Sequence, residues 1–372
     1  MTTWHLLTPE YPPACGGVGD YTALVADALT AAGDTVHVWH PAPGAPRGEP
    51  RSPAPVVHEL PDRFGAASRA AITSGVRANP GVLLAEYVPG AFGARGLNVP
   101  FCRWMARMRR SGVDVRVMFH EPFFYFGFAR PWRNVFAVVQ RVMAAILLRA
   151  GTRIYYSTAT WSRLLSPYGP QAHVDILPIP STIPVDVPAD DAMGARASRK
   201  GGFLIGHFGT FGAHIASQLG EILPALLRRL PAARVLLVGR GGVAFARTLP
   251  ADIRDRVDAT GVDTGTGIAT ALRACDLLLQ PYPDGVTTRR TSVMAALTTS
   301  LPVLTSDGAL TEPVWAQSGA VALAPANDVA AMVSAAASLA ADPSARAALG
   351  ARGRRLYDEQ FALDVTITRM RR

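Results

Sequence analysis

Cysteine and lysine are the residues that this chain of 372 amino acids uses least. Its three cysteines, Cys15, Cys102 and Cys275, stand far apart and form no CxxC pair, which excludes the usual ligand spacing of a zinc site and the framework of a disulfide-rich domain. They are predicted to be buried or free thiols in a reducing compartment. Lys200 is the only lysine, so arginine supplies nearly all of the basic charge.

Long apolar runs and targeting signals are also missing. No stretch reaches the roughly 18 to 20 uninterrupted apolar residues that span a bilayer, and the N-terminus lacks the basic region and apolar run of a signal peptide. The segment nearest to a membrane span, 134–151, is interrupted by Gln140, Arg141 and Arg149, which favours a core helix over a helix at a membrane surface. A cytoplasmic protein is therefore expected.

Charge is scarce and unevenly distributed. Charged residues make up 17% of the chain and hydrophobic residues 49%, which is the composition of a globular protein, and the length suits two domains. The formal net charge is +9, and residues 1–185 hold 17 basic against 11 acidic residues. This excess would attract an anionic substrate or a membrane surface, or it is a solvated, arginine-rich surface. No nucleic acid partner is expected.

Short apolar runs alternate with segments of helical periodicity, which predicts parallel sheets covered by helices on both faces. Strands are expected at 4–8, 35–40, 56–60, 81–88, 113–120, 153–158 and 174–179, then at 203–209, 234–239, 257–261, 276–282, 302–306 and 320–324. Helices are expected at 19–33, where Gly33 is a C-cap signal, and at 214–230, 266–273, 291–300 and 327–341. The fold class is α/β, with two doubly wound, Rossmann-like domains that face a central cleft.

The predicted domains are an N-terminal one at 1–185 and a C-terminal one at 203–355. Residues 186–202, rich in Pro, Gly and charge and without periodicity, form the predicted linker. A last helix within 356–372 is expected to cross back to the N-terminal domain. Because ligands of open α/β sheets bind beyond the carboxyl ends of the strands, functional residues are sought in the loops that follow strands.

Two glycine-containing loops join a first strand to a first helix. In residues 8–22, Gly16 and Gly17 allow a close approach of the backbone to a phosphate at a helix N-terminus, although the spacing is not GxGxxG and an ordinary glycine turn is the alternative. In residues 206–214, Gly209 and Thr210 occupy the equivalent place in the second domain. Together the two loops fit a diphosphate held between the domains.

A third loop precedes an Ala-rich helix in PYPDGVTTRRTSVMAAL, residues 281–297. Asp284 and Gly285 predict a turn, and either Thr291 or Ser292 is expected to cap the helix. Arg289 and Arg290 can supply forked donors and fixed positive charge to phosphate oxygens. A solvated surface arginine pair is the alternative.

A fourth group of polar side chains ends two strands of the first domain. His120 and Glu121 close an apolar strand and are candidates for hydrogen bonds to sugar hydroxyls or for proton transfer. Glu86 and Tyr87 end the preceding strand, and together with Phe123 they are the candidate acceptor-binding residues. A structural histidine and a loop-shaping segment are the alternatives.

The motifs in order along the chain resemble those of GT-B glycosyltransferases, and specifically the retaining family GT4 related to glycogen and sucrose synthases. The resemblance rests on EYPPACGGVGDYTALVADAL, FHE, FGTFG, VLLVGRG, DLLLQPYPDG and the helix before LPVLTSDG, and it spans nearly the whole chain. It implies a nucleotide-sugar donor on the C-terminal domain and an acceptor on the N-terminal one. It further implies that Gly16 and Gly17 touch the donor phosphate and that His120 lies near the transferred sugar.

The sequence departs from that family in two places. Asp284 stands near the first of two family glutamates and Ala295 where the second would be, so ribose recognition would pass to Thr291 or Ser292. The family's Arg and Lys pair after the second domain's first strand is missing. Arg289 and Arg290, with Arg240, are the predicted substitutes.

The function expected from this resemblance is metal-independent, retaining transfer of a sugar from a nucleotide sugar, most simply a UDP-sugar, with no other cofactor. The acceptor is expected to be a specialised metabolite, or else a lipid-linked or cell-envelope saccharide reached by peripheral membrane contact. A pyridoxal-phosphate phosphorylase is disfavoured because Lys200 lies in the linker. A nucleotide-sugar epimerase and a non-catalytic nucleotide-sugar-binding protein stay open. No oligomeric state is predicted.

Overall fold

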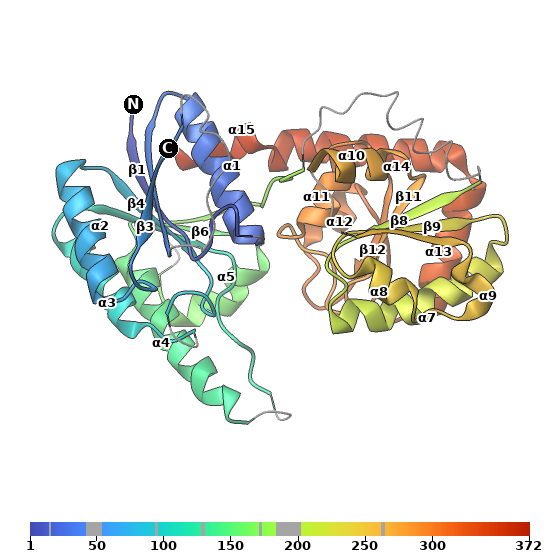
Figure 1. Ribbon diagram of the computed structural model, residues 1–372, viewed down its shortest axis with the longest axis horizontal. Helices are drawn as coiled ribbons and strands as arrows, with labels where there is room; N and C mark the ends of the chain where they lie inside the picture. The colour runs from blue at the N-terminus through green and yellow to red at the C-terminus, as the bar shows by residue number, and fades with distance from the viewer. Residues whose placement is uncertain are drawn as a thin grey trace. The chain divides into compact units, whose positions relative to one another are not determined.

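The computed structural model describes residues 1–14, 16–41, 54–93, 96–127, 131–170, 173–183, 202–261 and 265–372. The chain divides into two compact units (Figure 1). Unit 1 comprises Met1–Pro178 together with Leu363–Arg372, and unit 2 comprises Ile179–Ala362. The predicted linker, 186–202, lies outside the described residues except for Gly202. Cys15 lies outside them too, whereas Cys102 and Cys275 are buried free thiols, as predicted.

Unit 1 contains a seven-stranded sheet in the order β3-β2-β1-β4-β5-β6-β7, and every pairing in it is parallel. Its strands are β1 (Thr3–Leu7), β2 (Thr35–Pro41), β3 (Val56–Leu60), β4 (Val82–Tyr87), β5 (Asp114–Phe119), β6 (Arg153–Tyr156) and β7 (Val174–Ile176). The strands run apolar on both faces because helices cover both.

The helices of unit 1 are α1 (Gly17–Ala31), α2 (Ala66–Ala78), α3 (Val99–Arg110), α4 (Arg133–Ala150), α5 (Thr160–Leu165), a 3₁₀ turn (Ser166–Tyr168) and α15 (Leu363–Met370). Helices α2, α3 and α4 cover one face of the sheet (Figure 1). Helix α15, at the C-terminal end of the chain, belongs to unit 1 and lies beside α1. Helix α1 ends as predicted, with Gly33 in the left-handed region at φ 86°.

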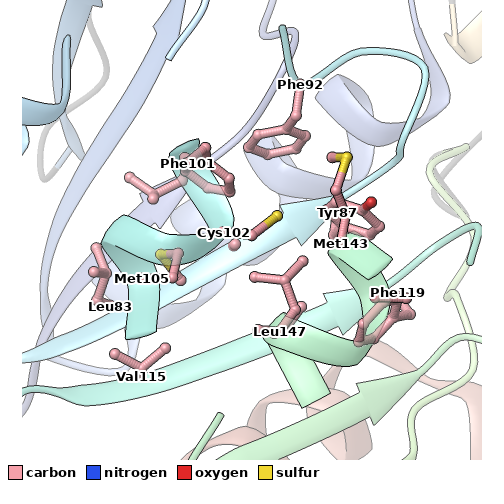
Figure 2. Close-up of a cluster of buried hydrophobic side chains, with 14 of the residues drawn as sticks. Leu83, Tyr87, Phe92, Phe101, Cys102, Met105, Val115, Phe119, Met143 and Leu147 are labelled. Carbon is pink, nitrogen blue, oxygen red and sulfur yellow. The ribbon is translucent and has the colours of Figure 1, made fainter. Parts of the chain in front are cut away.

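Figure 2 shows the main core of unit 1, which lies between the sheet and helices α3 and α4. Phe101 and Met105 of α3 and Met143 and Leu147 of α4 pack against side chains of β4 and β5. Helix α4 lies where the core helix was predicted, and its inward face buries Ala137, Met143, Ala144, Leu147 and Leu148. Burial of large apolar side chains at about 25 cal/mol per Å² is the main source of stability here.

Unit 2 contains a six-stranded parallel sheet in the order β10-β9-β8-β11-β12-β13. Its strands are β8 (Leu204–Phe208), β9 (Arg234–Val238), β10 (Val257–Gly261), β11 (Leu277–Gln280), β12 (Val303–Asp307) and β13 (Ala322–Pro325). Its helices are α7 (Ala213–Arg229), α8 (Gly242–Ala246), α9 (Ala251–Arg254), α10 (Gly265–Arg273), α11 (Thr291–Leu297), α12 (Pro313–Ser318), α13 (Val329–Ala341), α14 (Pro343–Leu356) and a π-helical turn (Tyr357–Phe361).

Two apolar cores flank the sheet of unit 2. One joins the sheet to α7 and α13, and the other joins it to α10, α11, α12 and α14. In each unit the strand order reverses once, between β1 and β4 in unit 1 and between β8 and β11 in unit 2. The fold is thus two doubly wound, Rossmann-like units, as the sequence predicted, and sheets of this kind bind ligands beyond the carboxyl ends of the strands, where the order reverses.

Candidate functional site

The loop after β8 lies at the reversal point of unit 2. It contains Gly209 and Thr210 and leads to Gly212, the N-cap of α7, where no side chain caps the helix. The neighbouring loop after β9 approaches so closely that a Cβ atom on Gly239 would lie 2.3 Å from the carbonyl oxygen of Gly209. Because the first N–H groups of a helix have no intrahelical partners, the exposed first turn of α7 offers donors to an anion.

The loop after β11 lies on the other side of the same reversal point. Gly285 has φ 94°, and a Cβ atom there would lie 2.7 Å from the backbone nitrogen of Gly308. The N–H of Leu310 donates to the carbonyl of Asp284 at 2.8 Å. The predicted Asp284–Gly285 turn is therefore held against the loop after β12, in a conformation that only glycine adopts easily.

Glu312 binds this loop through Thr288. The sequence analysis did not identify this residue. Its carboxylate is buried at the N-cap of α12 and accepts hydrogen bonds from both the backbone N–H and the hydroxyl of Thr288. The segment before Arg289 and Arg290 is consequently fixed by a buried charge-assisted contact.

Arg290 is the N-cap residue of α11, and its half-buried guanidinium lies 4.2 Å from the centroid of the Tyr282 ring. It also lies 3.5 Å from Asp284 Oδ1. The prediction that Thr291 or Ser292 caps this helix is wrong, because no side chain caps it. Ser292 instead pairs its hydroxyl with that of Tyr282 at 2.7 Å, and burial raises the pKa of Tyr282.

The remaining predicted donor residues are spread over unit 2. Arg289 is half-buried beside Arg290, and Arg240 is exposed after β9. Ala295, which the resemblance aligned with the second family glutamate, belongs to α11, is only 1% exposed and packs in the core. A glutamate at this position would be buried among apolar side chains, which is unfavourable without a partner for its charge.

A cavity of about 250 Å³ lies in unit 2 at the carboxyl ends of β11, β12 and β13, bounded by the first turns of α7. None of the predicted donor residues lines it. Its walls are His214, Ser217, Gln218, Glu221, Ile222, Pro281, Pro283, Ser306, Pro325, Asn327, Asp328, Val329 and Met332. The residues around it mix polar and apolar groups, as ligand sites do.

In unit 1 the ends of β4 and β5 bring Glu86 and His120 together. Nε2 of His120 lies 2.8 Å from Glu86 Oε2, so the imidazole donates to a fully buried carboxylate. The ring of Tyr21, from α1, meets the His120 ring edge-on at 5.1 Å between centroids. Burial, and then the charge of Glu86, raise the pKa of Tyr21 well above its usual range. Tyr21 is the member of this cluster that the sequence analysis missed.

The other predicted residues of unit 1 do not join this cluster at the surface. Tyr87 is fully buried among the core side chains of Figure 2, beside Phe92 and Phe119, so its candidate acceptor role is replaced by a packing role. Phe123 is 6% exposed and is stacked under Arg141. Glu121 is exposed in the loop after β5.

The glycine loop of unit 1 departs most from expectation. The carboxylate of Glu10 accepts hydrogen bonds from the backbone N–H groups of Val18 and Gly19 at 3.1 and 3.3 Å. A Cβ atom on Gly16 would lie within 2.0 Å of that carboxylate. The position predicted for a phosphate beside Gly16 and Gly17 is therefore filled by an anion of the chain itself.

Comparison with protein families identifies residues 203–342 by the family description "Glycosyl transferases group 1". Most of unit 2 thus forms a glycosyl transferases group 1 domain. Comparison with curated protein sequences finds no match.

Three solved structures show how far the likeness of fold extends. Sucrose-phosphate synthase from Thermosynechococcus elongatus has a TM-score of 0.75 at 16% identity, covering 100% of this chain and 97% of its own. HepE from Anabaena, solved with UDP and glucose, has a TM-score of 0.69 at 14% identity, with coverage of 100% and 98%. WaaG, a glycosyltransferase of lipopolysaccharide biosynthesis, has a TM-score of 0.65 at 17% identity, with coverage of 99% and 98%.

The two units therefore have the GT-B fold, and with this domain and this fold the chain is an enzyme of the glycosyltransferase kind. Among the described residues, no cluster of three or more His, Cys, Asp or Glu side chains could hold a metal ion. Within the same part of the chain, no helix is long and apolar enough to cross a membrane.

Proposed function

We propose that this chain transfers a sugar from a nucleotide sugar, with the donor diphosphate bound at the reversal point of unit 2. The observation that carries the proposal is the uncapped, exposed N-terminus of α7 beside the loop of Arg289 and Arg290, within the glycosyl transferases group 1 domain. Solved structures of similar fold contain UDP or UDP-glucose. We accordingly propose that the chain is a transferase of the GT4 type and that its donor is a UDP-sugar.

The chemistry that suits these residues is electrostatic. When the bond between sugar and diphosphate breaks, negative charge grows on the leaving oxygen, and guanidinium and helix N–H groups stabilise it without reorganising. The arginines supply positive charge in the role that a metal ion fills in metal-dependent transferases. We propose retention, because the departing diphosphate can itself accept the acceptor's proton on the same face of the sugar.

For unit 1 we propose a role in acceptor and sugar recognition through Glu86, His120 and Tyr21. Glu86 orients His120 by accepting from Nε2, and an imidazole held in this way can bind a sugar hydroxyl or move its proton. Because Glu86 is fully buried, we assign it to positioning His120 rather than to contact with a ligand.

The decisive first experiment is a thermal-shift screen of UDP-, GDP-, ADP- and dTDP-sugars, since a ligand that binds only the folded state raises the melting temperature. UDP-sugars are expected to give the largest shift. Incubation of the best ligand with and without acceptor then separates transfer from epimerisation, which needs no acceptor, and from binding without turnover. A screen in which no nucleotide sugar shifts the melting temperature contradicts the proposal.

The arginine pair has a matched control within unit 2. Arg289→Ala with Arg290→Ala is expected to weaken nucleoside diphosphate binding by about tenfold to a hundredfold, because charge-assisted bonds to phosphate are lost. Arg228 and Arg229 are also adjacent, but they stand in the last turn of α7, at the end opposite to Gly212. Arg228→Ala with Arg229→Ala should leave the affinity measured by calorimetry unchanged. Equal affinity of both double variants would remove Arg289 and Arg290 from the site.

A further inference from the structure

The outward face of α4 is apolar where a surface helix is normally polar. Trp132, just before the helix, and Val135, Val138 and Val142 are 61%, 65%, 52% and 49% exposed. Their spacing of three, three and four residues places them on one side of the helix, opposite the buried side chains. Six of the nine large hydrophobic side chains exposed in the described part of the chain fall within residues 125–142, so this surface is a cluster rather than a scatter.

The loop before α4 extends the same surface. The N–H of Phe124 donates to Gln140 Oε1 at 2.8 Å, and Arg141 donates to the carbonyl of Phe124 at 3.0 Å. These bonds hold Tyr125 and Phe126, each 56% exposed, beside the helix. We call Tyr125, Phe126, Trp132, Val135, Val138 and Val142 the α4 face. Figure 1 shows the first turns of α4 extending beyond the sheet and helices of unit 1.

Positive charge is concentrated in the part of the chain that contains the α4 face. Helix α3 packs beside α4 on the same side of the sheet and exposes Arg103, Arg107 and Arg110, and neither helix contains an Asp or a Glu. Residues 87–174 contain 12 arginines and only two carboxylates, a net formal charge of +10. That exceeds the +9 of the entire chain, so this segment alone accounts for the excess of basic residues.

We propose that the α4 face and the arginines of α3 dock unit 1 on the surface of an anionic lipid bilayer. Apolar side chains with Trp and Tyr among them enter the boundary between headgroups and acyl chains, while arginines bind lipid phosphates above it. A second copy of this chain is a poorer occupant, because pairing this surface with itself would bring two arginine-rich stripes together.

This docking is independent of the proposed donor chemistry, and it bears on the acceptor. Of the two acceptor classes expected from the sequence, a lipid-linked or cell-envelope saccharide lies at the surface where the docked unit would be held. A freely diffusing metabolite needs no such surface.

The test is cosedimentation with vesicles of phosphatidylcholine alone and with about 30% phosphatidylglycerol, without nucleotide. Wild-type protein is expected to bind the anionic vesicles, less so as salt rises. Val135→Ser with Val138→Ser should lower binding by about tenfold. The control is Val56→Ser with Val243→Ser, which alters valines that are 49% and 42% exposed on β3 and α8 and should change nothing.

The charge contribution is tested in the same assay. Arg103→Gln with Arg107→Gln should lower binding by about thirtyfold, since each basic residue near an anionic surface contributes roughly 1 kcal/mol, whereas Arg228→Gln with Arg229→Gln should not. Unchanged melting temperatures show that each variant is folded. The proposal is overturned if wild-type protein binds neither vesicle, or if the variants and their controls lose binding equally. It is also overturned if the α4 face instead mediates self-association in sedimentation experiments or capture of an acidic peptide.

Discussion

The N-termini of α1 and α7 lie at equivalent places in the two units, yet only the N–H groups of α1 are bonded to a side-chain carboxylate. Each follows the strand beside which the order of its sheet reverses, and each is preceded by glycines. At α1 the Glu10 carboxylate accepts from two backbone N–H groups, whereas at α7 no side chain caps the helix. A helix N-terminus attracts an anion in both units, but only unit 2 leaves the place open to a ligand.

Glycine spacing alone therefore does not distinguish the two loops. The motif around Gly16 and Gly17 has the residue types of an anion-binding loop, and the anion that it binds in this structure is Glu10. A ligand phosphate at α1 would have to displace that carboxylate. The comparison therefore supports the proposed donor site in unit 2, and the following variants test it in order of decreasing expected effect.

The largest effect is expected from adding a methyl group to Gly239, in the loop after β9, which packs against the loop that precedes α7. Gly239 has φ 115°, and its Cβ atom would lie 2.3 Å from the Gly209 carbonyl oxygen, so Gly239→Ala should destabilise the protein by about 3 kcal/mol or more. Gly17 has open space around it in the first turn of α1. Gly17→Ala should therefore be neutral or slightly stabilising in denaturant unfolding, and similar losses for both variants would contradict the difference between the loops.

A smaller effect is expected when a carboxylate is placed at the N-terminus of α7, as Glu10 is at the N-terminus of α1. Thr210 is exposed two residues before the N-cap of α7, and Thr210→Glu would place a carboxylate beside the free N–H groups. We expect nucleoside diphosphate affinity to fall by about tenfold, because the new charge repels the phosphates and competes for their donors. Thr210→Gln, which adds the same bulk without charge, should bind within about twofold of wild type in calorimetry. Equal losses in the two variants would mean that bulk, not charge, is responsible.

The converse change should free the N-terminus of α1. Glu10→Ala removes the carboxylate from Val18 and Gly19 and should lower stability by about 1 kcal/mol, as loss of a helix cap does. Inorganic pyrophosphate should then restore part of that stability in the variant and have less effect on wild type at α1. Glu59→Ala, which alters an exposed carboxylate of β3, is the control. A variant that is no more sensitive to pyrophosphate than this control would show that Glu10 does not keep anions out.

Much of the fold could be predicted because it depends on repeated local patterns. In the part of the chain that the structure describes, all thirteen strands lie where apolar runs indicated them, with ends displaced by a few residues at most. The doubly wound class followed from the alternation of strand and helix, whereas the points at which the strand order reverses are known only from the structure. The cap of α11 could not be predicted in this way, because Ser292 has a competing partner in Tyr282, ten residues away.

The candidate site was predicted less completely, since it depends on contacts between distant residues. Glu86 and His120 were singled out because both end strands, but their 2.8 Å contact required the β4–β5 register. Glu10 belongs to a quoted motif, yet nothing in its spacing shows that it folds back onto Val18. Tyr87 was misplaced because a residue that ends a strand can point into the core as readily as out of it.

The smallest effect is expected from mild acid, and it should distinguish the two units by their buried histidines. Unit 1 stacks His5, His37 and His58 across β1, β2 and β3. Burial lowers the pKa of His5 from 6.5 to about 4 and also lowers the pKa values of the other two. In unit 2, burial lowers the pKa of His207 to about 4.

Because these folded-state pKa values lie below those of the unfolded chain, the stabilisation is complete above pH 6.5 and declines as pH falls toward 4. Three such histidines in unit 1 against one in unit 2 should make unit 1 open first. Hydrogen exchange at pH 7 and pH 5.5, corrected for intrinsic rates, should show protection lost earlier around β1 and β2 than around β8. His58→Gln removes one protonation site and should therefore narrow the difference in protection between the two units. Earlier loss of protection around β8 than around β1 and β2 would contradict the order expected from these pKa values.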